Sequence, residues 1–173
     1  MTTPNAIDVL LESFGRIPDY LHDIVDDIDP DLLVRQPVID GHPNNSIGWI
    51  VWHIGRMADA QIADIMGGPE VYANGWAEKL GVPYPASTHG YGQSAGDVAR
   101  FTVSSPAALT AYYDAVHARI VEVLHAIQPA ELNRVVDERW TPPVTALVRL
   151  VSVVDDAAQH AGQAAYVKGL LTD

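Results

Sequence analysis

Cysteine is absent from all 173 residues of the chain. Its absence excludes disulfide bonds, thiolate ligands for zinc and a thiol nucleophile belonging to the protein itself. Any metal ion must therefore be held by histidine and carboxylate side chains. Any thiol chemistry requires a thiol supplied by a second molecule.

Positive charge and long apolar runs are also scarce. Ten lysine and arginine residues face 22 aspartate and glutamate residues, which gives a formal net charge of −12. This charge would repel a phosphate backbone, so we expect no nucleic-acid partner. No segment approaches the roughly 18 unbroken apolar residues of a membrane span, and the N-terminus lacks a basic region followed by a signal-type apolar block. We expect a soluble, cytoplasmic protein without membrane contact.

The composition that remains is that of a globular domain. Hydrophobic residues make up 48% of the chain and charged residues 18%. The length favours one domain over residues 1–173, large enough to bury about two-thirds of the surface of its unfolded chain.

Apolar residues recur at three- and four-residue steps, which predicts amphipathic helices in four segments. The first predicted helix carries its apolar stripe from Leu10 to Ile28, with a kink or restart expected at Pro18. The second begins after an N-cap at Ser46 and ends near Met66, where Gly-Gly-Pro follows.

Two further helices are predicted in the C-terminal half. The third begins at Ser105 and Pro106, a capping serine followed by a proline in the first turn. The fourth follows the sequence DERWTPPVT and has Gly169 near its end. Four such segments with little strand pattern predict an all-α fold, a four-helix bundle.

Residues 67–104 form a connector between the second and third helices that is much longer than usual. We expect a short helix around EVYANGWAEKLG and irregular chain at STHGYGQSAGD. The connector could cover one side of the bundle or pack against a second subunit, or it could form a wall or lid over a site. Its aromatic residues are Tyr72, Trp76, Tyr84, Tyr91 and Phe101.

Three residues have the types and spacing of a metal site. His53 lies at the edge of the apolar stripe of the second helix, where a lone histidine is more often a hydrogen-bonded core residue. Asp156 and His160 are four residues apart on the fourth helix, so they share one face, as a hydrogen-bonded pair or as two metal ligands. Together the three would form a two-histidine, one-carboxylate set with coordination positions left open.

The sequence resembles the DinB-like (YfiT-like) metal-binding four-helix proteins, and within them the actinobacterial group related to mycothiol-dependent enzymes such as maleylpyruvate isomerase. The resemblance extends over nearly the whole chain. It runs through NSIGWIVWHIGR, GWAEKLGVPYP, GYGQSAGDV, DAVHARIVEVL, VVDERWTPPVTALVRLVSVVDDAAQH and GQAAYVKGLL.

The resemblance implies a divalent metal held by His53, Asp156 and His160. Zinc is the metal most often found in such proteins, and the same ligands would accept nickel, manganese or iron. Many members carry histidine where this chain has Asp156, and the isomerase type carries glutamate, so the shorter carboxylate changes the reach of this ligand. Related proteins are often dimers, and we expect a homodimer.

Other residues are weaker candidates for the site. His117 could face the cavity as a proton donor or substrate contact, or it could be hydrogen-bonded to Asp114. Arg56 and Trp76 could border a ligand pocket, although a surface salt bridge is the simpler interpretation of Arg56. Surface or turn positions account for the remaining histidines, His22, His42, His89 and His125.

An open metal site beside a chain without cysteine suggests chemistry on an external thiol. A metal can bind a thiol and stabilise its thiolate near neutral pH, and the resemblance points to mycothiol. The expected reaction is S-transfer to a small electrophile or thiol-assisted isomerisation. The alternatives are a hydrolase that activates water on the metal, and a stress protein that binds a metal or ligand without turnover.

Overall fold

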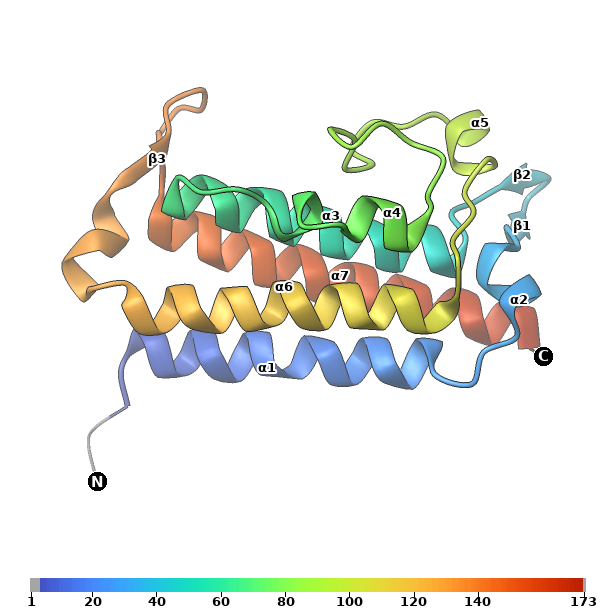
Figure 1. Ribbon diagram of the computed structural model, residues 1–173, viewed down its shortest axis with the longest axis horizontal. Coiled ribbons are helices and arrows are strands. Elements are labelled where there is room, and N and C mark those ends of the chain that lie inside the picture. The colour runs from blue at the N-terminus through green and yellow to red at the C-terminus, as the bar shows by residue number, and fades with distance from the viewer. Residues whose placement is uncertain (1–3, 173) are drawn as a thin grey trace.

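The computed structural model describes residues 4–172, and its secondary structure is mostly helical (Figure 1). The helices are α1 (Ala6–Val25), α2 (Pro30–Val34), α3 (Ile47–Met66), α4 (Trp76–Leu80), α5 (Ala95–Val98), α6 (Pro106–Ala126) and α7 (Ala146–Thr172), with 3-10 turns η1 (Val71–Ala73) and η2 (Pro129–Asn133). Two short antiparallel pairs are formed by β1 (Val38–Ile39) with β2 (His42–Pro43) and by β3 (Val135–Asp137) with β4 (Val144–Thr145). The expected all-α class is confirmed.

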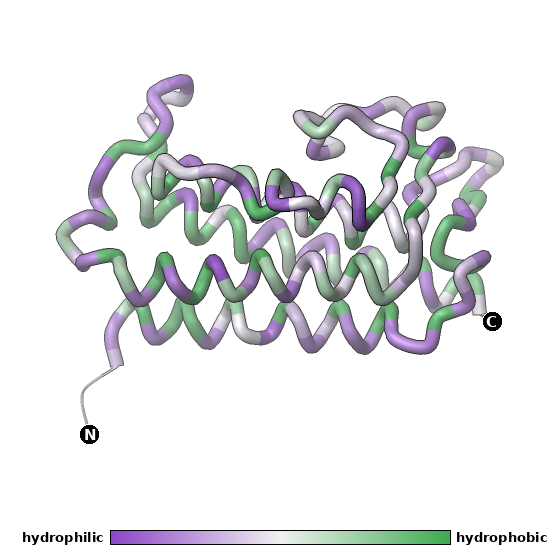
Figure 2. Tube along the Cα trace, in the orientation of Figure 1, coloured by the Kyte–Doolittle hydropathy of each residue, from purple (hydrophilic) through white to green (hydrophobic). Residues whose placement is uncertain are grey.

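The four long helices lie side by side along the length of the molecule (Figure 1). Helix α1 packs on α6 and α7, and α3 packs on the same two helices. Figure 2 shows hydrophobic and hydrophilic residues alternating along α1 and α6, which is the pattern of helices that bury one face. No helix among residues 4–172 is long and apolar enough to cross a membrane.

The helix starts follow the capping residues in the sequence. Ser46 accepts a hydrogen bond from the backbone of Trp49, and Ser105 accepts one from Ala108, which satisfies amides in the first turns of α3 and α6. Helix α1 continues through Pro18 as a single element, so the expected restart is not found.

Helix α3 is buried on most of its surface, because α6, α7, α2 and the connector all cover it. Two glycines on α3 let neighbouring aromatic rings pack directly on the helix backbone. A Cβ atom on Gly48 would lie 2.8 Å from the ring of Phe101, and one on Gly55 would lie 2.7 Å from the ring of Tyr112. The most enclosed long helix therefore carries His53, which is only 5% exposed.

The connector lies against α3 and α6 through η1 and α4. The expected short helix is present as α4, and the 3-10 turn η1 precedes it. The following segment is irregular up to Ser94, as expected, whereas the last three residues of STHGYGQSAGD, Ala95 to Asp97, belong to α5. Tyr72 and Phe101 are buried, so the connector covers one side of the helices within the chain. Tyr91, by contrast, is 80% exposed.

Candidate functional site

His53 and His160 meet between α3 and α7. Their ring centroids are 5.0 Å apart, and the rings are arranged edge to face. The Nδ1 atom of His53 lies 2.5 Å from the carbonyl oxygen of His89, and the Nδ1 atom of His160 lies 2.9 Å from the carbonyl oxygen of Asp156. A carbonyl can only accept, so each Nδ1 carries the proton and each Nε2 keeps its lone pair. No hydrogen bond within residues 4–172 reaches either Nε2.

The surroundings of His53 favour a neutral ring. Burial is the largest influence and lowers its pKa, and His160 acts in the same direction, while hydrogen bonding to the His89 carbonyl opposes them. Trp49 stacks on the ring with centroids 5.0 Å apart and planes 12° from parallel. A neutral, fixed imidazole is the form that binds a metal.

Asp156 lies in the same region, but its carboxylate is placed differently. Its Oδ1 atom is 3.5 Å from Nδ1 of His160, on the side of the ring away from Nε2. Its negative charge also acts on His53, whose pKa it raises in opposition to burial. Among the described residues, no three histidine or acidic side chains are arranged as a ready metal site. The structure pairs two of the three predicted ligands and leaves the third beside them.

The connector reaches the histidine pair at Gly90, whose backbone has a φ angle of +95°. A Cβ atom there would lie 2.6 Å from Nδ1 of His53, 3.0 Å from the ring of Trp49 and 3.1 Å from that of Trp52. Both the backbone angle and the close approach therefore require glycine. The sequence pattern predicts a surface or turn position for His89 and indicates no role for Gly90.

Arg56 fastens the same connector to α3. Its side chain is 1% exposed, so the expected surface salt bridge is wrong. The guanidinium donates to a Glu70 carboxylate oxygen at 2.6 Å and to the carbonyl oxygens of Ala86 at 3.0 Å and Thr88 at 3.2 Å. It also lies 4.0 Å from the centre of the Tyr72 ring. The bonds to Ala86 and Thr88 fix the backbone of the connector just before His89.

Asp59, one turn after Arg56 on α3, completes this buried cluster. Its carboxylate accepts hydrogen bonds from the backbone amides of Val71 and Tyr72 and from the hydroxyl of Tyr112, each at 2.8 Å. Burial raises its pKa, and these hydrogen bonds act against that rise. The acidic residue thus fixes the start of the connector, as Arg56 fixes its middle.

The other two candidates lie in different surroundings. His117 is half-buried on α6, and its Nε2 has no hydrogen-bond partner within residues 4–172. Burial lowers its pKa. Asp114, its expected partner, instead receives a hydrogen bond from His22. Trp76 packs on Tyr112 at a centroid distance of 5.6 Å, and the ammonium of Lys79 lies over its ring.

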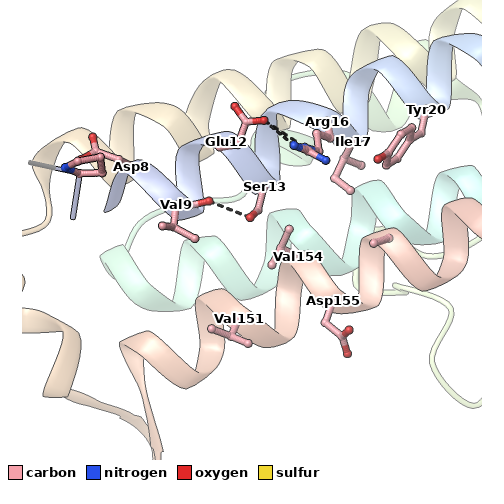
Figure 3. A pocket seen from close by; sticks show the side chains of 12 residues that line it. Asp8, Val9, Glu12, Ser13, Arg16, Ile17, Tyr20, Val151, Val154 and Asp155 are labelled. Atoms are coloured by element: carbon pink, nitrogen blue, oxygen red, sulfur yellow. Dashed lines mark hydrogen bonds and ion pairs between the residues drawn. The ribbon is translucent and has the colours of Figure 1, made fainter. Parts of the chain in front are cut away.

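Several clefts are large enough for a small molecule, and two of them measure about 600 and 500 Å³. The larger, about 600 Å³, lies between α1 and α7, has mostly apolar walls and an ion pair between Glu12 and Arg16, and is lined by none of the three predicted ligands (Figure 3). The second, about 500 Å³, includes His89 and so adjoins the histidine pair. Its walls are Met57, Ala60, Gln61, Asp64, His89, Tyr91, Asp137, Arg139, Trp140 and Arg149.

Comparison with known proteins places this fold in a family. No match was found among curated proteins. A solved structure described as the conserved protein of locus from Enterococcus faecalis is similar over 97% of this chain and 98% of that chain, with 27% sequence identity and a TM-score of 0.87. Residues 13–164 match the family model of the DinB superfamily, and the chain therefore belongs to this superfamily.

Proposed function

We propose that the protein is a divalent-metal-dependent enzyme that transfers a small thiol to an electrophile or uses the thiol to isomerise one. In this proposal α1, α3, α6 and α7 act as a four-helix bundle with the metal between α3 and α7. The main support is the pairing of His53 and His160, in which both Nδ1 atoms are held by backbone carbonyls and both Nε2 atoms keep a lone pair.

Two of the three donors are ready to bind a divalent metal, and the third would have to move. Histidine ligands commonly donate the second ring N–H to a carbonyl or carboxylate, which fixes the ring and increases its basicity. Both histidines have this support. Asp156 would supply the carboxylate by rotating to another staggered conformation, away from Nδ1 of His160. Two imidazoles and one carboxylate suit zinc, nickel, manganese or iron, and leave positions for a thiol.

The bound metal would supply one effect, a lower pKa for a thiol that reaches it. The protein would hold the His53 ring in place between Trp49 and the connector. In transfer, a bond forms between the thiol sulfur and the electrophilic carbon, the leaving group departs with its electron pair, and the thiol proton goes to solvent. In isomerisation the sulfur–carbon bond later breaks and the thiol is released unchanged.

We propose mycothiol as the thiol, because the chain resembles the mycothiol-dependent group over several segments and has no cysteine of its own. The test combines metal analysis of the purified protein with conjugation of mycothiol to a fluorogenic electrophile. Conjugation that requires both metal and mycothiol supports the proposal. Metal-dependent hydrolysis without thiol would favour a hydrolase, and saturable binding without turnover would favour a binding protein.

A homodimer belongs to the same proposal, but the connector aromatics give it little support. Tyr72 and Phe101 are buried within the chain, and only Tyr91 is strongly exposed. Light scattering at micromolar protein concentration tests this point. A monomeric mass would contradict the dimer and leave the metal site unaffected.

A further inference from the structure

The second cleft, which we call the Trp140 cleft, extends from Met57 and His89 toward the β3–β4 hairpin. His89 lines it, and the carbonyl of the same residue binds His53. Met57, in another wall, lies one helical turn after His53. A molecule in this cleft would therefore have one end at Met57 and His89, the residues through which the cleft adjoins His53.

The far end of the cleft is well separated from the histidines. On α3 it reaches Gln61, and on α7 it reaches Arg149, whose guanidinium donates to the Gln61 amide oxygen at 3.0 Å. At the helical rise per residue, Gln61 lies about 12 Å beyond His53 and Arg149 about 16 Å before His160. A small electrophile cannot span this distance. An elongated molecule that carries its reactive group at one end can.

The far end is polar but balanced in charge. The nearly buried Asp137 carboxylate accepts hydrogen bonds at 2.9 Å from Nε and Nη2 of Arg139 and from Nη2 of Arg149. Asp64 is the other acidic residue in the lining. The charges of two carboxylates and two guanidiniums cancel, so this lining has no surplus positive charge to attract an anion. The chain as a whole is strongly acidic, which also disfavours an anionic ligand.

Exposed aromatic rings complete the walls. Trp140 is 63% exposed and Tyr91 is 80% exposed, and both border the cleft. Such rings offer an apolar face together with a polar edge. Fixed planar donors and acceptors beside open aromatic faces suit a ligand with many hydroxyl groups and apolar ring faces, which is the chemistry of a sugar or cyclitol.

We propose that the Trp140 cleft binds the polyhydroxylated, sugar-like body of the thiol co-substrate and so directs the thiol to the histidine pair. The placement of the thiol rests on the proposed function, whereas binding of the body does not. Mycothiol has such a body, in which glucosamine and inositol carry the cysteine. A peptide thiol such as glutathione lacks it, although its length is comparable.

The test uses the full-length, metal-free protein and glucosaminyl-inositol, the body of mycothiol without its cysteine, measured by calorimetry. We expect saturable binding to wild type that Trp140→Ala weakens about tenfold or more, as for loss of an aromatic anchor. Tyr166→Ala is the matched control, because Tyr166 is a 65% exposed aromatic residue on α7 outside this cleft. Equal binding by wild type and Trp140→Ala would overturn the inference, as would tighter binding of glutathione than of glucosaminyl-inositol.

Kinetics separates this inference from the proposed function. With the metal-loaded protein, Trp140→Ala should raise KM for mycothiol about tenfold or more, because the truncated ring would contact the body, whereas Tyr166→Ala should keep the KM and kcat of wild type. Conjugation of mycothiol without any binding of glucosaminyl-inositol would overturn the cleft assignment alone. Binding of the body without conjugation would support the cleft and contradict the proposed reaction.

Discussion

The Nδ1 atom of His53 and the carbonyl oxygen of His89 are hydrogen-bonded across 36 residues of sequence. This contact fixes the ring of a histidine on α3 by means of a segment from the irregular part of the connector. The orientation of the candidate metal ligand therefore depends on the backbone path at residues 88–90, and changes in that path should alter metal binding.

Gly90→Ala should disturb this path, because its Cβ would lie 2.6 Å from Nδ1 of His53. Loss of the supporting hydrogen bond should lower metal affinity about 10- to 100-fold. Gly92→Ala is the matched control: Gly92 also has a positive φ, of +72°, but a Cβ there would have no atom within 4 Å. It should cost about 1–2 kcal/mol of stability and keep its metal. Equal metal affinity in both variants, measured by competition with a chelator, would contradict this role of Gly90.

His160→Ala should remove bound metal and metal-dependent thiol conjugation while the protein stays helical. One of the two proposed nitrogen ligands is lost, whereas the buried stripes of the long helices remain. His125→Ala, at an exposed position on α6, controls for loss of a histidine. Metal content is measured by mass spectrometry after identical purification, with helix content from circular dichroism. Full metal retention by His160→Ala would mean that the histidine pair is structural.

Arg56→Met should destabilise the protein strongly, by about 3–5 kcal/mol, because it leaves the buried carboxylate of Asp59 and the half-buried carboxylate of Glu70 without their partner. The same change should free the connector around residues 86–88, which Arg56 holds through two carbonyls. Arg100→Met removes an exposed ion pair with Asp97 and should cost no more than about 1 kcal/mol. Urea unfolding gives both values. Similar losses in the two variants would contradict a central role for Arg56.

His22 should make stability depend on pH. Its ring bonds Asp26 and also Asp114, which joins α1 to α6, and the Asp26 hydrogen bond is the largest cause that raises its pKa above 6.5. The folded state thus holds the proton more tightly than the unfolded state. The stabilisation is complete below the unfolded pKa and is lost as pH rises through the folded pKa.

The measurement compares wild type with His22→Gln by urea unfolding at a series of pH values. The advantage of wild type should be largest near pH 5.5, on the order of 1 kcal/mol or less for such an exposed pair, and should shrink by about pH 8.5. An advantage that grows with pH would have the wrong sign.

The long helices could be predicted because their signals are local. Apolar spacing together with Ser46 and Ser105 locates α3 and α6 closely. The expected restart at Pro18 is not found, because α1 continues through this residue as one helix that packs on α6 and α7. The path of the connector depends on Arg56 and Asp59, whose partners are far away in sequence, and helical spacing carries no information about such contacts.

In the candidate site, too, local patterns could be predicted, whereas contacts between distant segments could not. The pairing of His53 with His160 follows from two helix faces that each carry a histidine. The contact of His89 with His53 could not be found this way, because it uses a backbone carbonyl, which every residue possesses. Gly90, directly after His89, is the one sequence feature that indicates a close approach of the backbone at this point. Helical spacing alone places Arg56 on the surface, because it carries no information about the connector that covers this residue.

The parallel stacking of Trp49 on His53 also gives the molecule an internal optical reporter. Indole emission is sensitive to the charge of an imidazole in direct contact, so any event that changes the electronic state of this ring should change the fluorescence of Trp49. Of the four tryptophans in the chain, Trp49 is the one whose ring stacks on a candidate ligand. Occupancy of the histidine pair can thus be followed without a label or a coloured metal.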